Sequence, residues 1–244
     1  TVAATPGIRK LAMTTNGYRL ASRAADYAAA GIMALNVSVD SLDPARFAAI
    51  TGHDRLDEVL DGIAAARLAG ITSIKLNSVL MRGVNDDELE AFIAFVQEHD
   101  LSLRFIEVMR TNDNTAFFER HHLAGAEISE RLEAMGWNRL PREAGAGPAV
   151  EFAQGNRPGK IGIIAPYSKD FCTTCNRLRV SAKGKLHLCL FGDHGIDLRS
   201  LLQEDGQHEM LVQRILKLTA TKAPSHRLHE GNSGGTPHLA SIGG

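Results

Sequence analysis

Three cysteines close together carry the strongest chemical signal in the sequence. Cys172 and Cys175 form a Cys-x2-Cys knuckle, in which a tight turn brings two thiolates toward one metal centre, and Cys189 follows after thirteen intervening residues. Lys183 and Gly184 are typical of a turn between two short strands, so a hairpin can carry Cys189 back to the knuckle. This spacing predicts a metal centre built from three thiolates.

Three interpretations of this segment compete. The first is three reduced cysteines with only a structural role. The second is a structural zinc site, which needs a fourth ligand because such sites are closed and tetrahedral; His187 and His194 are the nearest candidates. The third is an iron–sulfur cluster with three protein thiolates and one open iron that can bind a substrate atom. The spacing does not separate zinc from iron–sulfur.

Two arginines lie directly after the knuckle. Arg177 and Arg179 are two residues apart and therefore share a face of an extended chain. The planar guanidinium fork suits phosphate and carboxylate oxygens. The pair indicates an anionic ligand held beside the metal centre, and its alternative is a solvated pair of surface charges.

The charge balance restricts the class of partner. The chain of 244 residues has 27 lysines and arginines against 28 aspartates and glutamates, a net charge of −1. A neutral chain has no global field that collects nucleic acid or anionic membrane, so an anion site must be a local basic patch. The sequence also has no apolar run of about 20 residues and no signal peptide. We expect a cytoplasmic protein without a nucleic-acid or membrane partner.

The first 110 residues alternate between strand-like and helix-like segments. Short apolar runs predict strands, and Ala-rich or periodic runs predict the helices between them. We expect Asn85 and Asp86 to cap the last of these helices. Strand–helix–strand repetition with short connections indicates parallel strands with crossover helices. The predicted strands cover residues 8–14, 32–40, 71–80 and 101–109, and the helices begin near residues 20, 56 and 89.

Polar residues recur along three of these strands. Strands covered by helices on both faces are almost wholly apolar, whereas side chains that face a barrel lumen meet ligand or water. We therefore expect a barrel with a working lumen, into which Lys75 and Arg104 bring positive charge. The polar strand residues are Asn36, Ser38, Asp40, Lys75, Asn77, Arg104 and Glu107.

The character of the chain changes after residue 110. Residues 141–160 are rich in glycine and proline and predict a hairpin or linker, a short strand follows at 161–165, and residues 210–218 have helical periodicity. We expect two domains, a partial barrel over residues 1–112 and a cluster-binding domain over residues 113–244. Four strands do not close a barrel, so either the sheet is open or an N-terminal part is absent from this sequence.

Six segments together resemble the GTP 3′,8-cyclase family, the radical S-adenosylmethionine (SAM) enzymes that begin molybdenum cofactor biosynthesis. The segments are TTNGYRL (14–20), NVSVDSLD (36–43), KLNSVLMRGVNDDE (75–88), RFIEVM (104–109), FCTTCNRLRVSAKGKLHLCLF (171–191) and the terminal glycine pair. They cover nearly the whole chain in order. The three-cysteine segment followed by Arg-x-Arg is the most specific of them.

The resemblance implies an α/β fold, an incomplete (β/α)6 TIM-like barrel that is N-terminally truncated here, with a C-terminal iron–sulfur cluster domain. It implies a radical SAM lyase with two [4Fe-4S] clusters. The first cluster reduces SAM to a 5′-deoxyadenosyl radical, which removes the 3′ hydrogen of GTP. The ribose carbon then attacks C8 of guanine to give 3′,8-cyclo-7,8-dihydro-GTP, while the second cluster binds the guanine base.

The resemblance also implies roles for residues at matching positions. Cys172, Cys175 and Cys189 would ligate the second cluster, and Ser38 and Met109 would contact SAM. The residues implied for GTP are Thr14, Lys75, Asn77, Arg104, Arg177 and Arg179, with the Gly-Gly tail reaching into the active site. The implied partners are an electron donor and, as the next pathway enzyme, cyclic pyranopterin monophosphate synthase; a homodimer is left open.

One departure from the family pattern is large. The motif Cys-x3-Cys-x2-Cys that holds the first cluster is absent, and no cysteine precedes Cys172. We expect this motif only in a missing N-terminal part, and we predict that the 244 residues alone do not cleave SAM. Formation of 5′-deoxyadenosine after dithionite reduction would overturn this. The alternatives are a zinc-stabilised nucleotide-binding module and another radical SAM enzyme with an auxiliary cluster.

Overall fold

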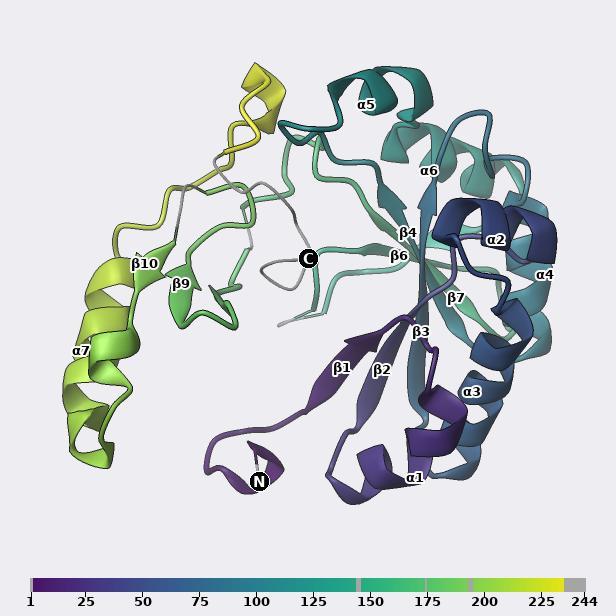
Figure 1. Cartoon of the computed structure of the whole chain (residues 1–244). Coiled ribbons are helices and arrows are strands. Elements are labelled where there is room, and N and C mark those ends of the chain that lie inside the picture. The colour runs from purple at the N-terminus through teal and green to yellow at the C-terminus, as the bar shows by residue number, and fades with distance from the viewer. Residues whose placement is uncertain (1, 144–145, 174, 193–194, 235–244) are drawn as a thin grey trace. The chain divides into compact units, whose positions relative to one another are not determined.

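The computed structural model describes residues 2–143, 146–173, 175–192 and 195–234 of the chain, whose course is drawn in Figure 1. The contacts divide the chain into two compact units. The first comprises residues 1–108 and 121–165, and the second comprises residues 109–120 and 166–244. The units therefore do not follow one cut along the chain, and the domain boundary expected after residue 112 stays a prediction.

The first unit is organised around a seven-stranded sheet. Five strands lie side by side and parallel, in the order β1 (Ala12–Thr15), β2 (Ala34–Ser38), β3 (Ser73–Leu80), β4 (Ser102–Glu107) and β7 (Lys160–Ile164). Two further strands, β6 (Val150–Ala153) and β5 (Asn138–Arg139), extend the sheet beyond β7 with antiparallel pairing. A mixed α/β fold with a mostly parallel sheet is confirmed, and barrel closure stays a prediction.

Helices cover one face of this sheet (Figure 1). Alternate strand residues such as Leu76 and Phe105 point into the helix layer and are fully buried, and the Phe92 ring meets Phe105 edge-on at a centroid distance of 5.7 Å. Each fully buried side chain of this size contributes about 1.5–3 kcal/mol. The helices of this unit are α1 (Leu20–Ala29), α2 (Pro44–Thr51), α3 (Leu56–Leu68), α4 (Leu89–Glu98) and α6 (Gly125–Ala134), with a short 3-10 helix η1 (Val2–Ala4).

Helix α2 was not predicted, although its local signals are clear. Asp43 is its N-cap and accepts a hydrogen bond from the Arg46 backbone N–H at 2.7 Å, and Pro44 occupies the first turn, where its missing N–H costs nothing. The helix is only eight residues long and its apolar period is weak, so periodicity alone did not reveal it.

The predicted caps of α4 are wrong. The N-cap of α4 is Glu88, and it makes no side-chain capping bond. Asn85 instead accepts from the Met81 backbone N–H at 2.7 Å and donates to the Asp40 and Val79 carbonyls, while Asp86 accepts from the Gly83 N–H. Both side chains are used by nearby loop backbone, which ties the loop after β3 to the end of β2.

The prediction that Glu107 faces the lumen with Arg104 is also wrong. The two residues are three apart on β4, so a period of two sends them to opposite faces. Glu107 lies on the helix side with Leu103 and Phe105, is only 3% exposed, and meets His122 Nε2 at 2.7 Å.

The second unit has little regular structure. The short strands β10 (Ile196–Asp197), β9 (Lys185–His187) and β8 (Arg179–Val180) form an antiparallel sheet in that order. The predicted β8–β9 hairpin is confirmed, and Gly184 adopts the positive φ of 67° that its turn requires. The remaining elements are α7 (His208–Thr219) and the 3-10 helices η2 (Arg199–Leu201), η3 (Asp205–Gln207) and η4 (Leu228–Glu230); α5 (Thr115–His121) joins the two units along the chain.

Within the part of the chain that the structure describes, no helix combines the length and the apolar character needed to cross a bilayer.

Candidate functional site

The sheet face opposite the helices carries polar side chains in register, and we call it the polar face. Its first row joins Thr14, Asn36, Lys75, Ser102 and Lys160, which are successive Cα partners across five strands. The Asn36 side-chain amide donates to the Thr14 hydroxyl at 3.4 Å. The period of two predicted from the sequence is thus confirmed for this face, and strand register brings its residues together.

The second row lies one step further along the strands. Ser38, Asn77, Arg104, Gly162 and Glu151 are its successive partners. Arg104 donates to the Asn36 Oδ1 atom at 3.2 Å. Among the described residues, the buried Arg104 Nε and Asn77 Oδ1 atoms have no hydrogen-bond partner. Buried polar atoms in native proteins are almost always paired, so these two are atoms that a ligand would satisfy.

A cavity of about 740 Å³ opens on the first-row side of this face. This volume lies within the range typical of small-molecule sites. Three of the cations that line the cavity were not predicted: Lys10 precedes β1, Lys160 begins β7, and Arg142 follows β5. Lys160 could have been found only from the register of β7 against β4. The charged lining residues are Lys10, Lys75, Arg104, Arg142, Lys160, Glu143 and Glu151.

The lysines and arginines that line the cavity favour the binding of a negatively charged ligand. Burial lowers the pKa of Lys75 below its ordinary value, and the neighbouring Arg104 guanidinium lowers it further. Burial also lowers the pKa of Arg104. Glu151 offsets part of this repulsion, with its Oε1 atom 3.8 Å from Lys75 Nζ. An anion of several charges, such as a polyphosphate, would relieve the repulsion between these cations.

A second cavity, of about 340 Å³, lies at the carboxyl ends of β1 and β2, where Ser38, Asp40 and Tyr18 contribute to its wall. The loop that follows Asp40 is held by a buried carboxylate. Glu88 accepts from the Ser41 hydroxyl at 2.7 Å and from the Leu42 backbone N–H at 2.8 Å. This contact joins the segments 36–43 and 75–88, a link that the sequence alone did not show.

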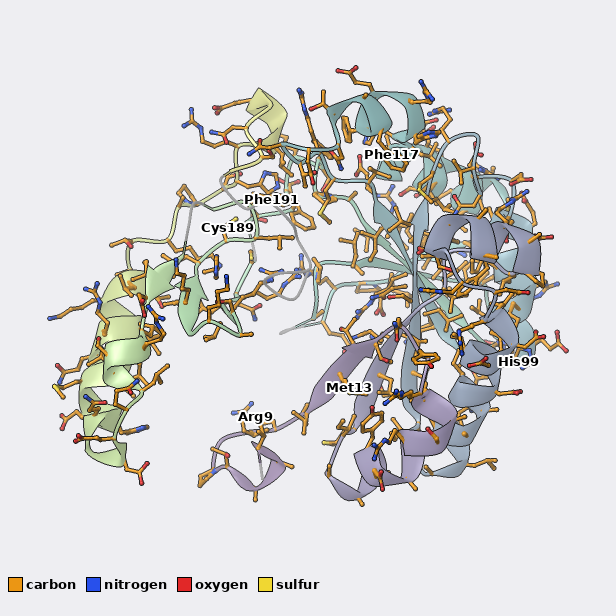
Figure 2. All side chains as sticks on the ribbon, viewed as in Figure 1. Arg9, Met13, His99, Phe117, Cys189 and Phe191 are labelled. Atoms are coloured by element: carbon orange, nitrogen blue, oxygen red, sulfur yellow. The ribbon has the colours of Figure 1, made fainter. Side chains whose placement is uncertain are left out.

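The three thiols of the second unit lie close enough to influence one another. The neighbouring Cys172 and Cys175 contribute to the raised pKa of Cys189, after the larger effect of burial. Cys175 N–H donates to the Cys172 carbonyl at 3.1 Å, which closes the knuckle turn, and Cys189 follows β9 on the loop that also carries Phe191 (Figure 2). All three cysteines are free thiols of intermediate exposure.

Backbone donors point at two of the sulfurs. Burial raises the pKa of Cys175, but the Arg177 backbone N–H and the Lys222 ammonium more than offset it, so that the pKa falls below its usual range. The Phe191 backbone N–H likewise donates to the Cys189 sulfur. Hydrogen bonds to the charged form favour a thiolate, and thiolate is the form that ligates metal.

The fourth ligand that a closed zinc site needs is not supplied, within the part of the chain that the structure describes, by the candidates named from the sequence. Among the described residues, no group of three His, Cys, Asp or Glu side chains is arranged tightly enough to hold one metal ion. His187, one candidate for a fourth zinc ligand, packs its ring against Gly195, and His194 lies outside the described residues.

The two arginines after the knuckle continue its half-buried face. Cys175, Arg177 and Arg179 are half-buried, whereas Asn176, Leu178 and Val180 between and after them are exposed. This alternation agrees with the shared face predicted for the arginines. Of the remaining predicted residues, Met109 belongs to the second unit, where its carbonyl accepts from the Asn114 amide at 2.9 Å, and the Gly-Gly tail lies outside the described residues.

The mixed α/β fold with a mostly parallel sheet is consistent with the radical SAM enzymes, and two family models match the chain. The Radical SAM superfamily model matches residues 2–96, and the Molybdenum Cofactor Synthesis C model matches residues 101–228. The first match covers β1 to α4, and the second covers β4, the rest of the sheet and the cysteine segment.

Several relatives named GTP 3′,8-cyclase match the whole chain. The relative from Aeromonas hydrophila is 57% identical over 244 residues, which are 71% of its length, and one from Stenotrophomonas maltophilia is 56% identical over 75% of its length. A relative from Vibrio parahaemolyticus is 51% identical over 243 residues, or 73% of its length. The chain belongs to the GTP 3′,8-cyclase family.

Proposed function

We propose that this chain carries the GTP-binding and second-cluster functions of a GTP 3′,8-cyclase, the radical SAM lyase that converts GTP to 3′,8-cyclo-7,8-dihydro-GTP in molybdenum cofactor biosynthesis. The fold would be an incomplete (β/α)6 barrel with a cluster domain. When bound, the SAM and [4Fe-4S] groups of this family supply radical chemistry. An electron donor and an enzyme that consumes the cyclised nucleotide would be the partners.

The observation that carries this proposal is the arrangement of the three thiols. Cys172 and Cys175 share one knuckle turn, both contribute to the pKa of Cys189, and N–H donors point at two of the three free thiols. Three thiolates leave one iron of a four-iron cluster without a protein ligand, and that iron can take a donor atom of a purine base. A closed zinc site would instead exclude substrate.

The residues of the polar face would bind the anionic part of the nucleotide. Lys75 and Arg104 would pair with phosphate oxygens, and the Arg104 Nε–H would donate to one of them. The buried Asn77 Oδ1 atom would instead accept from a hydroxyl of the nucleotide, a hydrogen bond that it lacks within the described residues. Thr14 lies on β1 in the same row as Lys75 and would add a hydroxyl. Ser38, at the end of β2, would contact SAM from the wall of the smaller cavity.

In the second unit, Arg177 and Arg179 would also bind GTP. Both are half-buried on the face that carries Cys175. Guanidinium groups hold phosphate or a purine carbonyl oxygen with fixed geometry, so they would orient the nucleotide relative to the ligand-free iron. Met109 would contact SAM, as the family resemblance implies.

Anaerobic reconstitution with ferrous iron and sulfide tests the proposal. We expect a brown protein with iron and sulfide in the equal amounts of a [4Fe-4S] cluster, and we expect GTP to change the EPR spectrum of the dithionite-reduced cluster. CTP, which has the same triphosphate and a pyrimidine base, is the matched control and leaves the spectrum unchanged. A colourless protein that carries zinc, or identical spectra with and without GTP, contradicts the proposal.

A further inference from the structure

Lys222, which follows α7, reaches the cysteine knuckle. Its Nζ atom donates to the Arg177 carbonyl at 3.0 Å and to the Cys175 carbonyl at 3.1 Å, and it lies 3.5 Å from the Cys175 Sγ atom. An ammonium group has three donors, so these contacts use all of them. The side chain is thereby fixed as a positive charge against one of the sulfurs.

The segment that carries Lys222 is anchored on both sides. Before it, α7 ends in turn bonds that include Lys222 N–H to the Thr219 carbonyl at 3.1 Å. After it, the buried His226 ring packs against Phe171 and Phe191, at centroid distances of 5.9 and 5.2 Å. Phe171 precedes Cys172 directly and Phe191 lies two residues after Cys189. The segment therefore packs against the chain beside Cys172 and the chain beside Cys189.

The charge of Lys222 has a consequence that the backbone donors do not share. The N–H groups of Arg177 and Phe191 are neutral dipoles, whereas Lys222 brings a full positive charge to a half-buried sulfur. Electrostatic interactions are stronger in such surroundings than in water. A group that becomes more negative on reduction is stabilised by a cation at this distance, and hydrogen bonds and charge near the sulfurs set the reduction potentials of iron–sulfur clusters.

We propose that Lys222 is a positioning residue for the cluster. Its ammonium group holds the Cys172–Cys175 knuckle in place and favours the reduced state of the group bound there. The inference rests on the proposed function, because it takes that group to be an iron–sulfur cluster. The redox step is the transfer of one electron from dithionite to the oxidised cluster. The role needs no further reactant.

The test compares midpoint potentials of the reconstituted chain and its variants. Its three cysteines are the only cysteines of the chain, so the cluster signal has one source. Lys222→Met removes charge and donors, and Lys222→Gln keeps a donor without charge. Lys217→Met, on the exposed surface of α7, is the matched control. Titration with dithionite, followed by absorbance and EPR, gives the reduced fraction at each potential.

We expect the ratio of reduced to oxidised cluster at a fixed potential to fall roughly tenfold in both neutral Lys222 variants, a shift of about 59 mV for a one-electron couple. Lys217→Met stays at the wild-type potential. Neutral variants that keep the wild-type potential overturn the inference and leave the proposed function intact. A wild-type chain without iron and sulfide overturns both.

A fourth variant keeps the test decisive when a substitution at Lys222 causes loss of the cluster. If both neutral variants fail to hold it, Lys222→Arg, which keeps the charge and several donors, decides the matter. Cluster retention in Lys222→Arg supports the positioning role. Cluster loss in all three Lys222 variants overturns the charge-based role, because a cation at this position would then make no difference.

Discussion

The polar face of the first unit and the cysteine segment of the second unit are held in place by different means. The polar face stands on strands whose opposite face is packed into a helix-covered core, with Leu35, Leu76 and Leu103 fully buried. The cysteine segment stands on strands of two or three residues, and no residue of α7, which is wholly described, is buried. Sheet register fixes the first site, whereas the second depends more on what its side chains bind.

This difference has an energetic meaning. A site backed by a core exists before its ligand arrives, and its residues need little reordering on binding. A site with few buried apolar residues gains much of its order from the bound group, because metal binding and folding are then coupled. Removal of the bound group is therefore expected to affect the second unit far more than the first.

The largest expected effect follows from Cys189→Ser. This substitution removes one of three thiolates, so the reconstituted chain loses its iron and sulfide and the second unit loses protection against hydrogen exchange. The first unit keeps its protection, because its core does not involve the cluster. Ser200→Ala, at an exposed position of the second unit, is the control and retains both. Equal loss of protection in the two units would break the comparison.

The same contrast separates what the sequence could and could not predict. Period-two alternation fixed the faces of Asn36, Lys75 and Arg104, because strand geometry is local and regular. Glu107 was placed wrongly, since its spacing of three from Arg104 is not a strand period. The cysteine knuckle and its hairpin were also predictable, because turn residues and ligand spacing are local.

Contacts between distant segments were not predictable. Lys222 lies 47 residues from Cys175 and has no motif around it, so only the fold brings its ammonium to the sulfur. Lys10 and Lys160 join the cavity through the pairing of β1 and β7 with other strands, which one sequence does not show. Asn85 was assigned a capping role from its position before a helix, but it bonds to loop backbone in the structure.

The next effect in size concerns the arginines after the knuckle. Replacement of Arg177 or Arg179 by alanine removes hydrogen bonds from a charged donor, which contribute about 1.5–3 kcal/mol each. We expect GTP affinity, measured by calorimetry on the cluster-loaded chain, to fall by roughly 10- to 150-fold in each variant with the iron content unchanged. Arg214→Ala, exposed on α7, controls for loss of charge alone. Unchanged affinity in both variants would remove the role assigned to them.

A smaller effect is expected on the polar face. Lys75→Met removes a half-buried cation, and we expect GTP affinity to fall about tenfold, as for one charged hydrogen bond near the lower limit. Because Lys75 has a lowered pKa in the folded chain, wild type binds fewer protons folded than unfolded in the range just below the ordinary value of 10.5. Its free energy of unfolding therefore rises with pH through that range.

Lys75→Met is expected to lack this rise. Urea denaturation at a series of alkaline pH values measures it, and Arg23→Met, at an exposed position of α1, is the control that keeps the rise. If the variant keeps both its GTP affinity and the alkaline rise, Lys75 is not a ligand-binding cation of the polar face. The contrast between the polar face and the cysteine segment would then lose a residue that the fold positions before the ligand binds.

The smallest effect is expected at Asp40, at the end of β2. Burial raises the pKa of this carboxyl above its ordinary value of 3.8, and the hydrogen bond from the Val79 backbone N–H, at 2.8 Å, offsets only part of that. Between 3.8 and the raised pKa, the folded chain binds more protons than the unfolded chain, so the free energy of unfolding falls as pH rises. The full cost is present at neutral pH and is lost as the solution is acidified through the raised pKa.

Asp40→Asn keeps an oxygen that can accept from Val79 and removes the charge, so it is expected to abolish this fall and to leave iron content unchanged. Hydrogen exchange of the β2 and β3 amides at a series of acidic pH values locates the change within the first unit. The exposed Asp61→Asn on α3 retains the wild-type dependence. Should Asp40→Asn also lower the iron content of the second unit, the two sites would be energetically coupled, and the independence that their different packing implies would be wrong.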